Sequence, residues 1–122
     1  MRSKVVFMKS KENKPSFAKI EIEASDSDVF KIKWPEEYAN FEIEYGEAVK
    51  NGIEYAFEIR SKIKNKKNFK FTILDFVELI VDTNIYAVQC AATVAAWEAM
   101  GENIKNINYY YDQHWNAEII LK

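Results

Sequence analysis

Hydrophobic and polar residues alternate along several stretches of the chain, and a period of two is typical of half-buried strands. The clearest stretch is 16–24, where alanine and isoleucine at even positions alternate with mostly charged residues at odd positions. Residues 76–81 either extend a neighbouring strand past a bend or pair with it as a hairpin. Further strands are predicted at 5–8, 29–34, 69–74 and 115–122.

Two longer stretches have the spacing of helices. In residues 44–60, apolar and small residues recur every three or four positions, which predicts an amphipathic helix. Residues 81–101 are apolar almost all round, so we expect a second and more buried helix. Asp82 or Thr83 can cap its first turn, and Gly101 suits the left-handed position after its last turn.

A ridge of small residues lies on the first predicted helix, at Ala48, Gly52 and Ala56. A glycine inside a helix costs roughly 1 kcal/mol relative to alanine. Close approach to a sheet would offset that cost, so we expect the ridge to face the strands. The preceding residues 35–43 lack a clear period, and we interpret them as an irregular connection with a short strand at 41–43.

The order of these elements predicts an α+β fold. Strands come first, followed by helix, strand, helix and strand, which favours two helices covering one face of a mostly antiparallel sheet. If the strands that flank a helix are parallel, the general rule predicts a right-handed crossover between them.

Length and composition indicate one folded domain over residues 1–122. Hydrophobic residues make up 48% of the chain, and no apolar run approaches the ~18 residues of a membrane span. No signal peptide is evident, and a lone cysteine excludes an internal disulfide, so we expect a cytoplasmic, soluble protein. The net charge of −2 argues against a general nucleic-acid binder.

The sequence contains no catalytic constellation. His114 and Cys90 are the only histidine and cysteine, whereas a structural zinc needs three or four ligands. Cys90 lies among alanines in a predicted helix, where a thiol is usually an inert hydrophobe. The three glycines are scattered and form no phosphate-binding loop. We therefore expect no enzyme, no cofactor and no metal.

Charge is unevenly distributed along the chain. Residues 2–19 carry six basic side chains and one acid, residues 21–47 carry nine acids and two lysines, and residues 60–70 carry six basic side chains and no acid. In one interpretation these are solvated side chains, and the basic and acidic segments lie against each other in the folded protein. In the other, they form a bipolar surface that orients a charged partner.

Aromatic residues crowd the C-terminal part of the chain. Tyr109, Tyr110 and Tyr111, with Trp115 nearby, place rings on both faces of any strand formed there. Either loops and helix ends cover both faces, or exposed rings stack on bases or anchor a protein interface.

Three motifs stand out along the chain: PSFAKI at 15–20, the pattern EY..AV..GI at 44–53, and VDT at 81–83 with the alanine-rich run to Gly101. Together they resemble domain IV of translation elongation factor G and of the related tetracycline-resistance ribosomal protection proteins, over residues 5–122. The resemblance implies a two-layer sandwich with a four-stranded sheet, two helices on one face and a left-handed βαβ crossover. In that family the domain binds no nucleotide, and its loop tips reach the ribosomal decoding site.

The chain departs from the family at those tips. KSKENKP at 9–15 replaces a glycine-rich basic loop, and residues 76–80 contain no tip histidine. No GTPase domain accompanies the match, so we expect a stand-alone domain that does not drive translocation.

We therefore expect a non-enzymatic macromolecule-binding domain with the ribosome or another macromolecule as partner. The alternative is an acidic protein-binding or immunity-type module that neutralises a basic protein. Neither hypothesis involves a membrane, and the oligomeric state stays open because an uncovered edge strand could pair two copies. The candidate ribosome contacts are Lys9, Lys11, Lys14, Lys62, Lys64, Lys66 and Lys67. The candidate protein contacts are Glu36, Glu37, Glu42, Tyr109, Tyr110, Tyr111, His114 and Trp115.

Overall fold

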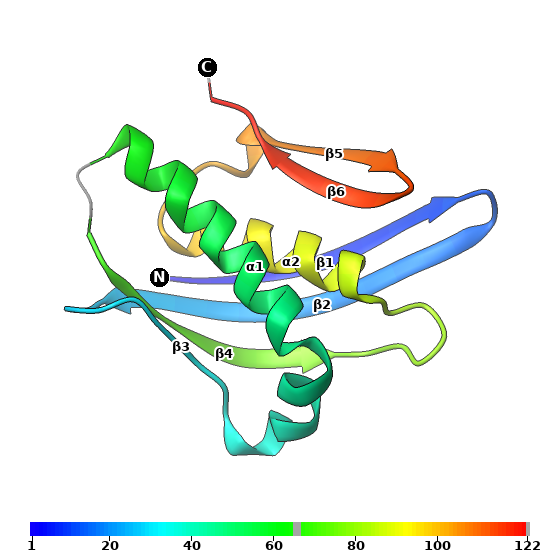
Figure 1. Cartoon of the computed structure of the whole chain (residues 1–122), viewed down its shortest axis with the longest axis horizontal. Coiled ribbons are helices and arrows are strands. Elements are labelled where there is room, and N and C mark those ends of the chain that lie inside the picture. Colours follow the sequence, from blue (N-terminus) through cyan, green and yellow to red (C-terminus); the bar gives the residue numbers. More distant parts are fainter. Residues whose placement is uncertain (65–66, 122) are drawn as a thin grey trace.

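Four strands form one mixed sheet in the order β1-β2-β4-β3 (Figure 1). The computed structural model describes residues 1–64 and 67–121. Strands β1 and β2 are antiparallel, as are β2 and β4, whereas β3 pairs with β4 in parallel. The strands are β1 (Arg2–Lys11), β2 (Lys14–Asp26), β3 (Lys31–Lys33) and β4 (Phe69–Val77).

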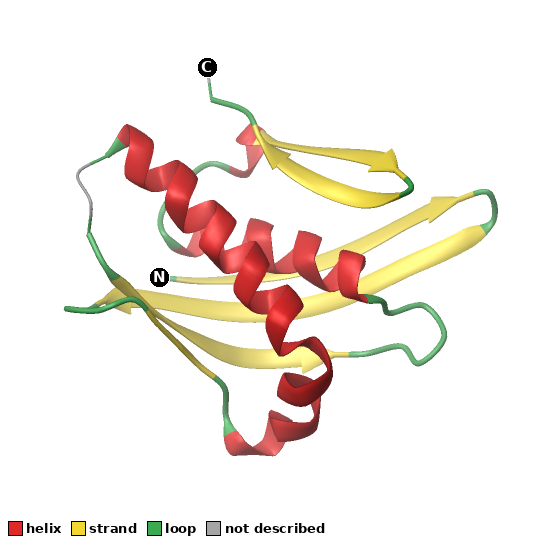
Figure 2. Ribbon diagram, in the orientation of Figure 1, coloured by secondary structure: helices red, strands yellow, loops and turns green. Residues whose placement is uncertain are grey.

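Two helices cover one face of this sheet (Figure 2). They are α1 (Ala39–Ile63), which follows the short 3-10 helix η1 (Glu36–Tyr38), and α2 (Ile85–Ala99). Helix α2 packs on β1 and β2 as well as on α1. Its alanines let it lie close to its neighbours on several sides, and Trp97 is fully buried at 0% exposure. The predicted two-layer α+β sandwich is therefore confirmed.

The crossover from β3 through α1 to β4 is left-handed. Viewed from the helix side, β3 and β4 both run from left to right, β4 lies above β3, and α1 crosses in front of the sheet (Figure 1). The general right-handed rule is therefore wrong for this chain.

A C-terminal hairpin forms a separate two-stranded sheet. It follows the 3-10 helix η2 (Ile104–Asn106) and consists of β5 (Ile107–Asp112) and β6 (His114–Ile119). The predicted final strand is thus present, but its antiparallel partner is β5 rather than a strand of the main sheet. The hairpin packs on α2, and the ring of Phe7 lies 5.2 Å from that of Tyr109.

Gly52 faces α2, so the prediction that its ridge faces the strands is wrong. A Cβ added to Gly52 would lie 2.6 Å from the carbonyl oxygen of Gln89 and 3.0 Å from the Cβ of Ala92. The hydroxyl of Thr93 also donates to the carbonyl oxygen of Gly52 at 3.2 Å. The glycine therefore permits close contact between the two helices.

Two predicted boundaries also differ from the structure. Residues 41–43 are helical rather than extended, and the Phe41 ring packs 4.9 Å from that of Phe76, so tertiary packing starts α1 earlier than expected. The cap of α2 is Asn84 rather than Asp82 or Thr83, since its side chain accepts from the backbone N–H groups of Tyr86 and Ala87.

Among the described helices, none is long and apolar enough to cross a membrane.

Candidate macromolecule-binding site

Three connections meet at one end of the molecule, which we call the loop end: residues 11–16, 78–84 and 111–115 (Figure 1). Glu12 and Asn13 both have positive φ, at 53° and 63°, as a type I′ hairpin turn requires. Lys11 pairs directly with Lys14 across this turn. The KSKENKP segment is therefore a tight, strand-flanked turn that projects its lysines.

Hydrogen bonds tie the first two connections together. The backbone N–H of Phe17 donates to the carbonyl oxygen of Asp82 at 2.9 Å. The amide of Asn84 donates to the Ser16 hydroxyl at 3.2 Å while its oxygen caps α2. These two connections are thus held in one arrangement relative to each other.

Two lysines of β1 lie over aromatic rings of β5. The Lys9 ammonium is 5.2 Å from the centre of the Tyr109 ring, and the Lys11 ammonium is 5.5 Å from that of Tyr111. Both distances fall within the range of cation–π attraction. Burial raises the pKa of Tyr109 to about 12, so its phenol is neutral at physiological pH. The positive charges at this end are therefore interleaved with aromatic surface.

Tyr86 and His114 form a parallel ring pair. Their centroids are 3.9 Å apart with an interplanar angle of 6°. The His114 Nδ1 lies 3.1 Å from the carbonyl oxygen of Trp115. Because a carbonyl only accepts, Nδ1 is the donor in this contact.

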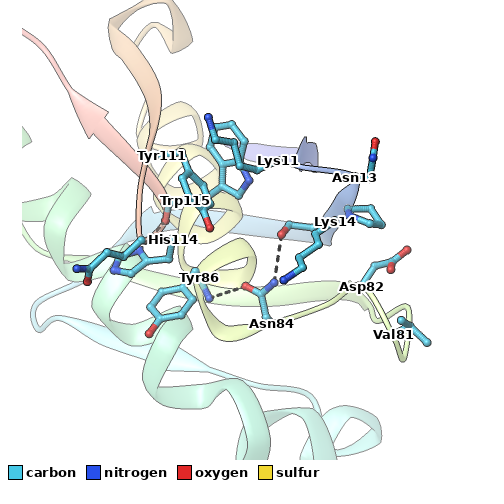
Figure 3. Close-up of a pocket in the computed structure, with 13 residues that line it drawn as sticks. Lys11, Asn13, Lys14, Val81, Asp82, Asn84, Tyr86, Tyr111, His114 and Trp115 are labelled. Atoms are coloured by element: carbon cyan, nitrogen blue, oxygen red, sulfur yellow. Dashed lines mark hydrogen bonds between the residues drawn. The ribbon is translucent and has the colours of Figure 1, made fainter.

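A groove of about 420 Å³ lies among these groups (Figure 3). Tyr86 and His114 lie at one end of it, and Lys11 and Lys14 lie toward the other. Its remaining walls are formed by Asn13, Pro15, Ser16, Val81, Asp82, Asn84, Tyr111, Gln113 and Trp115.

A second hollow of about 270 Å³ shares Tyr86, His114 and Trp115 with the groove and reaches Cys90. Burial raises the pKa of the Cys90 thiol to about 12, and its residue is only 2% exposed. A thiol in this state is a poor nucleophile. Within residues 1–64 and 67–121, no group of three His, Cys, Asp or Glu side chains could hold a metal ion.

The second lysine group lies far from the loop end. Lys62 and Lys64 lie at the C-terminal end of α1, on the opposite side of the molecule from the β1–β2 turn (Figure 1). Lys64 pairs with Glu102, which also lies 3.3 Å from Arg60. Lys67 pairs with Asp26 at 2.9 Å, and Lys66 lies outside the described residues. Much of this charge is therefore matched by acids of the same chain.

The acidic candidates occupy a third region, at the start of α1. Glu36 and Glu37 lie in η1 and Glu42 in the first turn of α1, and none of the three is buried. Acids near a helix N-terminus stabilise it through the helix dipole, which gives them a structural role.

The aromatic candidates of the hairpin divide by strand face. Tyr109, Tyr111 and Trp115 share one face, whereas Tyr110, 42% exposed, lies on the other. His114, next to the turn, reaches the groove through its contact with Tyr86. Sequence reasoning missed Tyr86 and Asn84. An exposed tyrosine in the first turn of an otherwise apolar helix is the signal that could have identified Tyr86.

A crystal structure of a Thermus thermophilus protein, ttk003000868, is similar to this chain, with a TM-score of 0.69 and 18% sequence identity. The match covers 82% of this chain and 15% of that one, so this chain spans a small part of the other protein's length. At this identity the likeness shows the fold alone. No family model and no curated protein matches the chain.

Proposed function

We propose that this domain is a non-enzymatic RNA-binding module, with ribosomal RNA as its target and the loop end as its contact surface. One observation carries the proposal: Lys9, Lys11 and Lys14 share this end with Tyr86, Tyr111, His114 and Trp115. Lysines supply phosphate contacts, and aromatic rings supply stacking, which is the combination that RNA-binding surfaces use.

The resemblance to elongation factor G domain IV supports the same surface. In that family the loop tips reach RNA, and the corresponding connections here are the β1–β2 turn and residues 78–84. The turn keeps a basic character without glycine because Lys11 and Lys14 flank its two positive-φ residues. A local basic end also makes the overall net charge of −2 a weak argument against RNA.

The proposal is tested by sedimenting the protein with purified ribosomes at low and moderate salt. We expect comigration that weakens steeply with salt, because each phosphate contact releases counterions. Replacing Lys9, Lys11 and Lys14 together by alanine should weaken binding at least about tenfold and flatten its salt dependence.

The matched control replaces the exposed Lys31, Lys33 and Lys50 by alanine, which changes the net charge equally but lies away from the loop end. This control should bind as the wild type does. Equal weakening by both triple variants, or no comigration of the wild type at either salt, would contradict the proposal.

A protein partner is the second candidate, favoured by the region at the start of α1. Ile43 is 85% exposed there, and it shares a shallow hollow with Trp34, Glu42 and Glu47. An apolar contact flanked by the carboxylates of Glu42 and Glu47, with Lys50 at its edge, suits a basic protein. A 1:1 complex with such a protein that is lost on changing Ile43 to Asp, with no ribosome binding, would favour this function.

A further inference from the structure

We propose that the groove at the loop end receives one unstacked nucleobase, so that the domain prefers single-stranded RNA to a duplex. The inference rests on the proposed function and specifies the form of RNA that the same site takes. The volume of the groove, about 420 Å³, lies within the range of sites for small molecules.

The ring pair supplies a preformed stacking platform. The planes of Tyr86 and His114 are nearly parallel, at 6°, so each ring fixes the tilt of the other. Tyr86 is 41% exposed, which leaves part of its ring surface uncovered. Its backbone is also held, since its N–H donates to the Asn84 side chain at 3.1 Å. A base that stacks here meets a surface that needs little reorganisation.

The lysines of the groove suit the phosphate beside the base. Lys11 and Lys14 lie toward the other end of the groove, where a flanking phosphate would be neutralised (Figure 3).

The ring of Trp115 forms part of the same wall, whereas its indole Nε1 is buried away from solvent, where no acceptor among the described residues reaches it. Bases in a duplex are already paired and stacked, so only an unpaired base can enter between these groups. The geometry therefore favours a single strand.

Fluorescence anisotropy tests the preference, with a labelled single-stranded RNA of mixed sequence and with the matched duplex. The wild type should bind the single strand about tenfold more tightly, because stacking on an aromatic side chain contributes about that factor for one base. Tyr86→Leu should abolish the preference while leaving duplex binding unchanged. Tyr86→Phe keeps the ring and should bind as the wild type does.

Tyr110→Leu is the matched control, since Tyr110 is about equally exposed at 42% but lies outside the groove. It should leave both affinities unchanged, and circular dichroism should show all variants folded. If single strand and duplex bind alike, or if Tyr86→Leu weakens neither, the nucleobase site is overturned. The RNA-binding function would then still stand on the lysine variants, whereas binding of neither RNA by the wild type would remove both.

Discussion

At the residue scale, burial decides the chemistry of Cys90. Cys90 belongs to α2 and is only 2% exposed to solvent. The loss of solvation raises the pKa of its thiol to about 12. Since the thiolate is the reactive form, both its population and its access are low in the folded protein.

We therefore expect the native protein to react with a disulfide reagent such as DTNB at pH 8 at least about a hundredfold more slowly than a free thiol does. Denaturant should restore the ordinary rate. A Cys90→Ala variant gives the background, and rapid labelling of the native protein would show that the thiol is not buried as described.

Single residues of the site could be named from the sequence, but their grouping could not. The charge pattern identified Lys9 and Lys11, and the aromatic cluster identified Tyr109 and Tyr111. Their pairing depends on the β5–β6 hairpin lying beside β1, which is a tertiary arrangement. Tyr86 was missed because its role depends on His114, which is 28 positions further along the chain.

At the scale of the elements, the contact between α1 and α2 depends on Gly52. An added methyl group would meet two backbone atoms of α2, the oxygen of Gln89 at 2.6 Å and the nitrogen of Thr93 at 3.0 Å. Backbone atoms inside a helix cannot move aside cheaply, so the helices would have to separate.

We expect Gly52→Ala to destabilise the fold by about 1–3 kcal/mol, the usual range for overpacking a core. The control is Gly46→Ala in the same helix, whose added Cβ would meet only the Cγ of Glu42 at 3.5 Å. That substitution should stabilise by about 0.5–1 kcal/mol, because alanine favours the helix. Urea unfolding measures both, and equal effects of the two substitutions would show that the helix contact is looser than described.

The approximate positions of most strands and helices could be predicted from the sequence because alternation and helical spacing are local properties. The strands at 16–24 and 69–74 lie within β2 and β4. The start of α1 could not be predicted, since Phe41 packs against Phe76, which is distant in the sequence. The partner of β6 was missed because β5 is rich in exposed residues and shows little alternation of burial.

At the scale of the whole molecule, several groups favour the proton-bound form in the folded state. Burial raises the pKa of Cys90 and of Tyr109 to about 12, and burial with a bond to Glu78 raises that of Tyr45. The folded state therefore binds more protons than the unfolded chain above about pH 9. The stabilisation of the folded state by these protonated groups is fully present below the pKa values that the groups have in the unfolded chain. It is lost as the pH rises toward 12.

We expect the free energy of unfolding to fall by at least about 2 kcal/mol between pH 9 and pH 11. Tyr109→Phe removes one of these groups and should reduce the decline by about 1 kcal/mol. Urea titrations at several pH values measure this, with Tyr110→Phe as the exposed control. A decline that is unchanged in Tyr109→Phe would argue against the burial of that phenol.

The C-terminal hairpin has a consequence for how the chain folds during synthesis. It covers α2 through β6, and Ile119 donates its backbone N–H to the Tyr55 hydroxyl of α1 at 2.9 Å. Yet α2 leaves the ribosome before the hairpin does. A nascent chain that has emerged as far as Gly101 therefore displays an alanine-rich apolar helix with one side uncovered, and such surfaces are where chaperones bind and where nascent chains aggregate. Emergence of residues 107–119, which form the hairpin, ends that exposure.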